Sequence, residues 1–476
     1  MDSSQSVTAG DRAIVDTIVR SALAVLLIGQ ATIGYTDSDI WGHMSIGLDM
    51  LRDRRFLWVD PYSFTHDQPW VNHEWLWDLV TAALYRSGDL PALLGLRAAA
   101  IATVVWLVDR ATRPAPPMAR LALLAILGLA CVGQWRSTRP QLATLALYAT
   151  TLANIQARWL PVLFAAWANL HGGWIYGLAA VGLRAVFTRR GQPLVTAALC
   201  ALATLINPYG IHLWTAILGA TTRGWTDLTE WQPVWRLAAG ADALALWILL
   251  AASAAWLWRR VAPDPWAWTW TLLTLAAAAQ SRRLTGLAAV TLAMLVVPAW
   301  TSVTPNVPIA WTPRRRLSSA AVLAASAALA AWWVWPSATC FPPMPAWRAP
   351  EADAVAFIRS AGVHRVLPHF DYGEYAIYHL RPDVKVGIDN RRETVYSATA
   401  VADNQRFTDG ADPDYPLRIG ADAVWWPSSD RELLRTLEAR GWVRHFEGPR
   451  TVVLLRRPGS LVHGRHLPGH PCFPEP

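Results

Sequence analysis

Long apolar runs separated by short polar turns make up most of the first 335 residues of the chain. Many approach the roughly 20 residues that a helix needs to cross a hydrocarbon core of about 30 Å. Two shorter stretches, 73–88 and 159–170, could cross, lie half-inserted or pair with a neighbouring helix. The first run has no small-residue cleavage site, so we interpret it as a signal anchor. We predict membrane spans at residues 13–35, 91–108, 119–135, 138–157, 174–188, 192–206, 241–258, 265–280, 284–300 and 317–335.

Arginine clusters between these runs predict the orientation of the chain. They lie at residues 110–120, 189–190, 259–260 and 314–316, and the positive-inside rule places them in cytoplasmic loops. The C-terminal tail then lies outside and the N-terminus inside. This requires an odd number of crossings, and we expect about 11 to 13. The outer side would carry residues 36–72, 135–139, the turn at His171, residues 207–240 and residues 281–283.

The composition changes after Trp335. Residues 336–350 form a Pro-rich linker, and in residues 351–476 helical and strand patterns alternate, which is typical of a small α/β domain. Cys340 and Cys472 bracket this tail; a disulfide between them and two free thiols are both compatible with the sequence. We predict helices near 350–362, 372–379 and 429–440, strands at 365–367, 384–388 and 423–426, and a last hairpin ending at 452–456.

Composition and charge favour a membrane protein and exclude a nucleic-acid binder. Hydrophobic residues are 53% of the 476 and charged residues 16%, too few to cover a soluble globule of this size. The formal net charge of +8 comes almost wholly from arginines between apolar runs, whereas a nucleic-acid binder gathers such charge on one soluble face. We therefore predict an α-helical polytopic membrane protein with a small extracytoplasmic α/β domain, with membrane lipid and no nucleic acid as partners.

The first outer loop carries the most informative chemistry. Asp37, Asp39 and His43 follow the first apolar run directly, and His73 and Glu74 end the loop. Carboxylates at a membrane face are poorly solvated and are usually functional. They can take a proton from a sugar hydroxyl, or hold a divalent cation that neutralises a phosphate leaving group. The structural alternative is that Asp37 caps a helix starting near Ile40, and that His73 and Glu74 begin the next helix.

Further polar residues lie in other predicted outer turns. Arg136, Arg139, Arg282 and Arg283 break the positive-inside trend, and their guanidinium groups could hold a lipid phosphate or simply contact lipid headgroups. His171 could contact a substrate or the aspartate pair, or be a structural hydrogen-bonding residue. An esterase is excluded because the chain has no Gly-x-Ser-x-Gly elbow.

Two other outer segments allow more than one interpretation. The loop with Glu230 and Trp231 is aromatic and acidic, and it could contact acceptor sugars. The tail loop 389–393 could bind a ligand or pack on the membrane body.

Several motifs accompany the aspartate pair. Together with the multi-span body and the outer tail, they resemble a bacterial branch of the GT-C-fold membrane glycosyltransferases. The motifs are Asp39-Ile-Trp41-Gly-His43, Asp60-Pro-Tyr-Ser-Phe-Thr65, Trp70-Val-Asn-His-Glu-Trp75, Asn169-Leu-His-Gly-Gly173, Asn207-Pro-Tyr-Gly210 and Tyr372-Gly-Glu-Tyr375.

The resemblance implies a sugar donor linked to polyprenyl phosphate, an outer-face acceptor (glycan, lipid or protein) and inversion at the anomeric carbon. It also implies a bacterial inner-membrane location and Asp39 as general base, with Asp37 assisting. A divalent cation (Mg, Mn or Ca) would be held by Asp37, Asp39 and Glu74. Many relatives carry an Asp-Glu pair instead, which leaves the identity of the base and the need for a metal open. The alternative function is a non-catalytic membrane scaffold or lipid-binding protein of the cell envelope.

Overall fold

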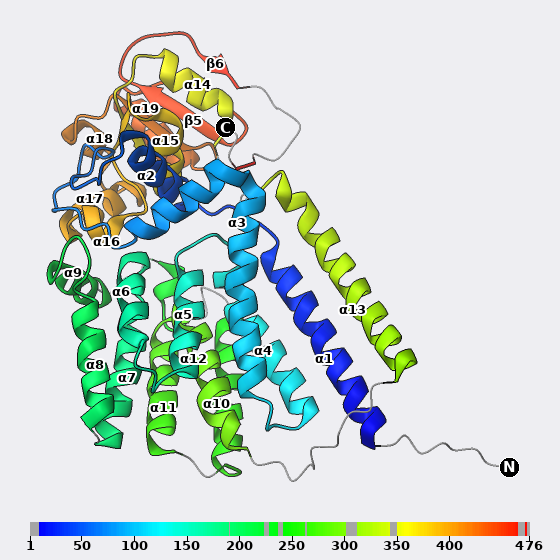
Figure 1. Ribbon diagram of the computed structural model, residues 1–476. Coiled ribbons are helices and arrows are strands. Elements are labelled where there is room, and N and C mark those ends of the chain that lie inside the picture. Colours follow the sequence, from blue (N-terminus) through cyan, green and yellow to red (C-terminus); the bar gives the residue numbers. More distant parts are fainter. Residues whose placement is uncertain are drawn as a thin grey trace.

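The apolar runs of the sequence are helical in the computed structural model, which describes residues 9–189, 191–222, 228–236, 241–261, 264–300, 312–342, 350–464 and 472–473. Most of these helices stand side by side in one bundle (Figure 1). They are α1 (Ala9–Thr32), α3 (Trp75–Ala111), α4 (Pro117–Trp135), α5 (Gln141–Ala153), α6 (Leu160–Leu170), α7 (Trp174–Thr188), α8 (Gly191–Ala203), α9 (His212–Thr222), α10 (Asp242–Trp258), α11 (Pro265–Gln280), α12 (Thr285–Thr291) with its continuations η4 (Leu292–Val296) and η5 (Val297–Ala299), and α13 (Pro313–Val334).

The lengths of the helices show that the chain is a membrane protein. Within the described residues, five are long and apolar enough to cross: Ile14–Thr32, Trp75–Ala111, Met118–Trp135, Arg282–Ala299 and Arg316–Ala338. The apolar helices α6, α7, α8 and α10 have only 11 to 17 residues. At 1.5 Å per residue they measure roughly 16 to 26 Å, less than the hydrocarbon core. The predicted 11 to 13 crossings therefore stay a prediction.

The doubtful stretch 73–88 is the first part of α3. The helix bends at Gly88 and Asp89, where the backbone leaves the helical region and Asp89 has φ 53°. In Figure 1 the part before the bend runs across the end of the bundle, and the part after it descends among the other helices.

Arginine-rich turns and the predicted outer turns lie at opposite ends of the bundle. The turns from α3 to α4, α7 to α8 and α10 to α11, and the start of α13, are at the end away from the tail (Figure 1). There Asp109 pairs with Arg20 at 2.7 Å and with Arg120 at 2.8 Å. The separation agrees with the predicted arrangement, while the orientation in the cell stays a prediction.

The tail forms a six-stranded sheet in the order β2-β1-β3-β5-β4-β6, so the predicted α/β tail is confirmed. β1 pairs in parallel with β2 and β3, and β5 pairs antiparallel with β3 and β4. All five residues of β5 are buried, as expected for an apolar central strand. The elements are α14 (Ala352–Ser360), β1 (Arg365–Pro368), α15 (Gly373–Leu380), β2 (Lys385–Val386), α16 (Arg392–Val395), α17 (Ala398–Thr408), α18 (Tyr415–Arg418), β3 (Ala423–Pro427), α19 (Arg431–Ala439), β4 (Val443–Glu447), β5 (Thr451–Leu455) and β6 (Val462–His463).

Loop 36–72 packs into this tail domain. It contains α2 (Asp39–Asp53), which lies among the tail helices in Figure 1. The buried ring of Trp41 contacts Tyr375, with centroids 5.1 Å apart. At the sheet edge, Val386 donates its N–H to the Tyr62 carbonyl at 2.9 Å and accepts one from Phe64 at 3.0 Å. Loop 36–72 and the tail thus share one hydrophobic core.

Buried polar contacts fasten the same interface. Arg391 donates to Asp60 of the loop and Asp389 of the tail, each at 2.7 Å. Arg381 pairs with Asp49 of α2 at 3.2 Å. Cys340 and Cys472 are joined by a disulfide, so the first part of the linker is tied to the end of the tail.

Gly47 lets α2 cross α3 closely, which gives a testable consequence. A Cβ at this position would lie 2.1 Å from the Asp78 carbonyl oxygen, and helix backbone moves away only at a cost. Gly47→Ala should destabilise the protein by about 1–3 kcal/mol and lower its melting temperature in detergent. Gly95→Ala is the control, because a Cβ there meets nothing within 4 Å; equal losses in both variants would contradict the close-crossing explanation.

Candidate functional site

Asp37 and Asp39 converge on one arginine. Arg139 Nε lies 2.6 Å from Asp37 Oδ2 and 3.1 Å from Asp39 Oδ2. The backbone N–H of Asp39 donates to Asp37 Oδ1 at 3.1 Å, a local turn that brings both carboxylates to the same side at the start of α2. Asp37 therefore shapes the turn before α2, while Ser38 holds the N-cap position that the structural alternative gave to Asp37. Asp37 also takes part in a charge cluster.

The charge cluster continues to a second arginine. Glu230 places Oε2 3.2 Å from Arg139 Nη1 and Oε1 3.1 Å from Arg283 Nη1, so one carboxylate bridges two guanidinium groups. The Arg283 guanidinium also lies over the Trp231 ring, 4.9 Å from its centroid. Arg139 follows α4 and Arg283 precedes α12, so two turns that are distant in the sequence meet at the Glu230 carboxylate.

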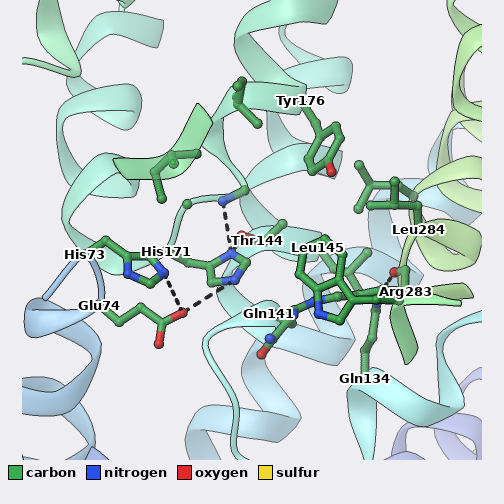
Figure 2. A pocket seen from close by; sticks show the side chains of 16 residues that line it. His73, Glu74, Gln134, Gln141, Thr144, Leu145, His171, Tyr176, Arg283 and Leu284 are labelled. Carbon is green, nitrogen blue, oxygen red and sulfur yellow. Dashed lines mark hydrogen bonds and ion pairs between the residues drawn. The ribbon is translucent and has the colours of Figure 1, made fainter. Parts of the chain in front are cut away.

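A cavity of about 90 Å³ adjoins this cluster (Figure 2). One side presents His73, Glu74 and His171, and Arg283 lies on the opposite side. The remaining lining is partly polar, with Gln134, Gln141, Thr144, Tyr176 and Trp231, and partly apolar, with Leu145, Ile175, Ile217, Leu284 and Leu287. The space thus combines charged groups with an apolar wall, which suits an amphipathic ligand.

Among the described residues that line this cavity, Glu74 is the one carboxylate, and it lies between two histidines. Its Oε1 is 3.4 Å from His73 Nε2 and 3.6 Å from His171 Nε2. The Gly173 N–H donates to His171 Nδ1 at 3.1 Å, so in the neutral ring the proton is on Nε2, facing Glu74.

The pKa values of His171 and Glu74 are both lowered, but for different reasons. Burial lowers the pKa of His171 to about 3 and keeps the ring neutral. Burial alone would raise the pKa of Glu74, but the neighbouring histidines outweigh it and hold that pKa below its ordinary value. Glu74 therefore stays a carboxylate beside a neutral His171 ring.

His43 is paired with the buried carboxylate of Asp78. Its Nδ1 is 2.7 Å from Asp78 Oδ1, and Asn72 donates to the other oxygen of Asp78 at 2.8 Å. Burial disfavours a charged ring. The hydrogen bond to Asp78 and the charges of Asp78, Glu74 and Asp39 nevertheless raise the pKa of His43 to about 9. A charged His43 ring therefore interacts favourably with all three carboxylates, and His43 is not among the described residues that line the cavity.

The pKa values of the two aspartates shift in opposite directions. Burial would raise the pKa of Asp37, but Arg139 outweighs this and lowers it. Burial raises the pKa of Asp39, and the charge of Asp37 adds to this against the opposing effect of Arg139. Of the two, Asp39 therefore holds a proton more readily.

The predicted metal ligands do not converge. Asp37 and Asp39 share Arg139, whereas Glu74 contacts His73 and His171. Among the described residues, no three His, Cys, Asp or Glu side chains are placed to hold one metal ion. The divalent cation expected at Asp37, Asp39 and Glu74 therefore stays a prediction.

The remaining predicted arginines lie apart from the cavity. Arg136 is exposed and lies over the Tyr35 ring, 5.9 Å from its centroid. Arg282 donates to the Arg236 carbonyl at 2.7 Å and is not among the described cavity-lining residues. Of the four arginines, Arg139 and Arg283 are thus the pair that meets at the anion.

Sequence reasoning missed three polar residues near the site. Gln134 and Gln141 line the cavity, and Gln134 donates to the Arg283 carbonyl. Arg97, wholly buried in α3, donates to the carbonyls of Ala31, Ile33 and Trp135, at 3.1, 3.0 and 2.6 Å. The signal for Arg97 was available, because a lone charge inside an apolar run is costly without a partner.

Comparisons with known proteins found similarity at the level of structure only. No family model and no curated protein matches the chain. ArnT from Cupriavidus metallidurans bound to undecaprenyl phosphate is similar over 94% of this chain and 99% of its own, with 14% identity and a TM-score of 0.47. ArnT from the same organism in the apo state is similar over 94% of this chain and 98% of its own, with 13% identity and a TM-score of 0.48. These identities are too low to carry over a substrate or the role of any residue.

The charge on His43 predicts a pH dependence of stability. Its folded-state pKa lies above the ordinary value of 6.5, so the charged ring stabilises the fold fully below pH 6.5. That contribution is lost as the pH rises through about 9. The melting-temperature advantage of wild type over His43→Gln should therefore shrink from pH 6.5 to pH 9, as measured by thermal unfolding in detergent. His66→Gln, an exposed histidine of the same loop, is the control; an advantage that stays constant with pH would contradict the assignment.

Proposed function

We propose that the chain is a bacterial inner-membrane glycosyltransferase that moves a sugar from a polyprenyl-phosphate carrier to a hydroxyl group of an outer-face glycan, lipid or protein. Its tail domain would lie outside the cytoplasm. The observation that carries the proposal is the bridge from Arg139 through Glu230 to Arg283 beside the cavity. Two guanidinium groups that converge on one anion offer the geometry that phosphate oxygens need.

Glu230 occupies the place where the carrier phosphate would bind. Its side chain is 43% exposed, against 12% for Asp37, so it is the more easily displaced of these carboxylates. A phosphate in its place would bind both arginines, with the prenyl chain along the wall of Leu145, Leu284 and Leu287. Once Arg139 turns to that phosphate, Asp39 loses its cationic partner and becomes available as a base.

In the transfer step, the acceptor hydroxyl oxygen bonds to the anomeric carbon on the face opposite the phosphate. The carbon–oxygen bond to the phosphate breaks, and the electron pair leaves with the polyprenyl phosphate. The hydroxyl proton passes to Asp39, which suits this role better than Asp37 because burial and the charge of Asp37 raise its pKa. A positioned base contributes about 10²–10⁴-fold, and arginine stabilisation of the leaving phosphate supplies much of the rest.

A second candidate, a non-catalytic lipid-binding scaffold, is favoured by one observation. Both aspartates are paired with Arg139, and neither is among the described residues that line the cavity. A scaffold would bind the same lipid phosphate without needing Asp39. Binding and transfer measured on one set of variants separate the two candidates.

Removing the proposed base should slow transfer strongly and spare lipid binding. Asp39→Asn is expected to slow sugar transfer by about 10²–10⁴-fold in an assay with purified protein and lipid-linked sugars from envelope extracts. Its affinity for undecaprenyl phosphate should change little, because that group binds the arginines. Asp53→Asn, at the far end of α2, is the control. Wild-type transfer by Asp39→Asn would rule out Asp39 as base, and binding without transfer by the wild type would favour the scaffold.

Substitutions of Arg283 and of Glu230 should change the affinity for the carrier lipid in opposite directions. Arg283→Gln should weaken binding of labelled undecaprenyl phosphate in nanodiscs about 10-fold or more, since charge-assisted hydrogen bonds contribute about 1.5–3 kcal/mol. Glu230→Gln should tighten binding, because the competing carboxylate is gone. Arg282→Gln is the matched control. Weaker binding by Glu230→Gln would show that Glu230 organises the site and is not displaced from it.

A further inference from the structure

The carboxylate of Asp39 also contacts the tail domain. Asn390 Nδ2 donates to Asp39 Oδ1 at 2.7 Å and to Ser38 Oγ at 2.5 Å. The Ser38 hydroxyl lies 3.4 Å from the same Asp39 oxygen. Arg139 is on the other oxygen, Oδ2. The two oxygens of Asp39 are thus held by two different parts of the chain.

The orientation of the Asn390 amide follows from its neighbours. Two acceptors face its nitrogen, so the flipped amide would set its oxygen against the Asp39 carboxylate. Within the part of the chain that the structure describes, Asn390 Oδ1 is buried and has no hydrogen-bond partner. A buried acceptor without a partner costs free energy. This cost is consistent with a side chain retained for the contact that its nitrogen makes.

The two residues beside Asn390 are held by buried contacts. Its neighbour Asp389 is fully buried, binds Arg391 at 2.7 Å and accepts a hydrogen bond from Tyr396 at 2.7 Å. Arg391 in turn reaches Asp60 of the first loop. The backbone on either side of Asn390 is therefore fixed both to the tail and to the loop that carries Asp39.

We propose that Asn390 is a positioning residue for Asp39: its amide N–H fixes Oδ1 and leaves Oδ2, the oxygen now bound to Arg139, to accept the acceptor's proton. This inference rests on the proposed function, in which Asp39 is the base. It makes the tail domain part of the catalytic machinery, because the group that orients the base comes from the loop after β2.

The experiment compares the pH dependence of transfer in Asn390→Ala and Asn390→Asp with wild type. The amide donor favours the charged carboxylate, so its loss should move the acid limb of the rate profile to higher pH. Asn390→Asp keeps the shape and adds a like charge, so it should move the limb further. Transfer at the optimum should fall about 10–100-fold, and undecaprenyl phosphate binding should not change.

Asn404→Ala, which alters another buried asparagine of the tail, controls for a general loss of tail stability. It should leave the acid limb in place, whatever its melting temperature. An unshifted limb in both Asn390 variants, while Asp39→Asn is inactive, would overturn the positioning role alone. Wild-type transfer by Asp39→Asn would overturn the proposed function, and this inference with it.

Discussion

The end of the molecule that carries the tail domain depends on one shared cation. Arg139 contacts three carboxylates, those of Asp37, Asp39 and Glu230. Negative charges this close would repel one another without a guanidinium between them. Arginine suits this position because its planar fork offers five donors, where a lysine ammonium offers a compact point charge. The turn before α2 and the segment that carries Glu230 are both held to the bundle through this side chain.

That sharing also gives the site a way to respond to a ligand. A group bound to several partners at once can release one of them when a stronger anion arrives, and the resulting change is confined to a few side chains. In this view the pairing of Asp39 with Arg139 is the resting arrangement. The cost of freeing Asp39 would be offset by the new contacts between the arginines and the phosphate.

Much of the fold, and the membership of the polar cluster, could be predicted from sequence because those features are local. Apolar runs gave the helices, and alternating patterns in the tail gave β1, β3 and β5. His73, Glu74, His171 and Arg283 were each picked from their own turn, and the structure brings them to one cavity. Which carboxylate faces that cavity could not be predicted. Asp37 and Asp39 turn to Arg139 instead, and that choice depends on where α4 ends relative to α2.

Long-range pairing was the larger gap. Asn390 and Asp39 form a hydrogen bond although they are 351 positions apart in the sequence. Glu374 packs closely on Gly42, where an added Cβ would lie 2.2 Å from a carboxylate oxygen of Glu374. Periodicity carries no information about such partners. From the sequence, the first loop and the tail are predicted as separate units. In the structure, the apolar face of α2 is buried against α15.

The shared core of loop 36–72 and the tail has a consequence for biogenesis. Trp41, Met44 and the strand-like backbone at 62–64 leave the ribosome long before the residues that cover them. While the intervening helices are synthesised, the apolar side chains and edge hydrogen-bonding groups of the loop lack the tail residues that cover them in the folded protein. The end of the molecule that carries the charge cluster is therefore completed last, when the tail folds back onto a segment made near the beginning.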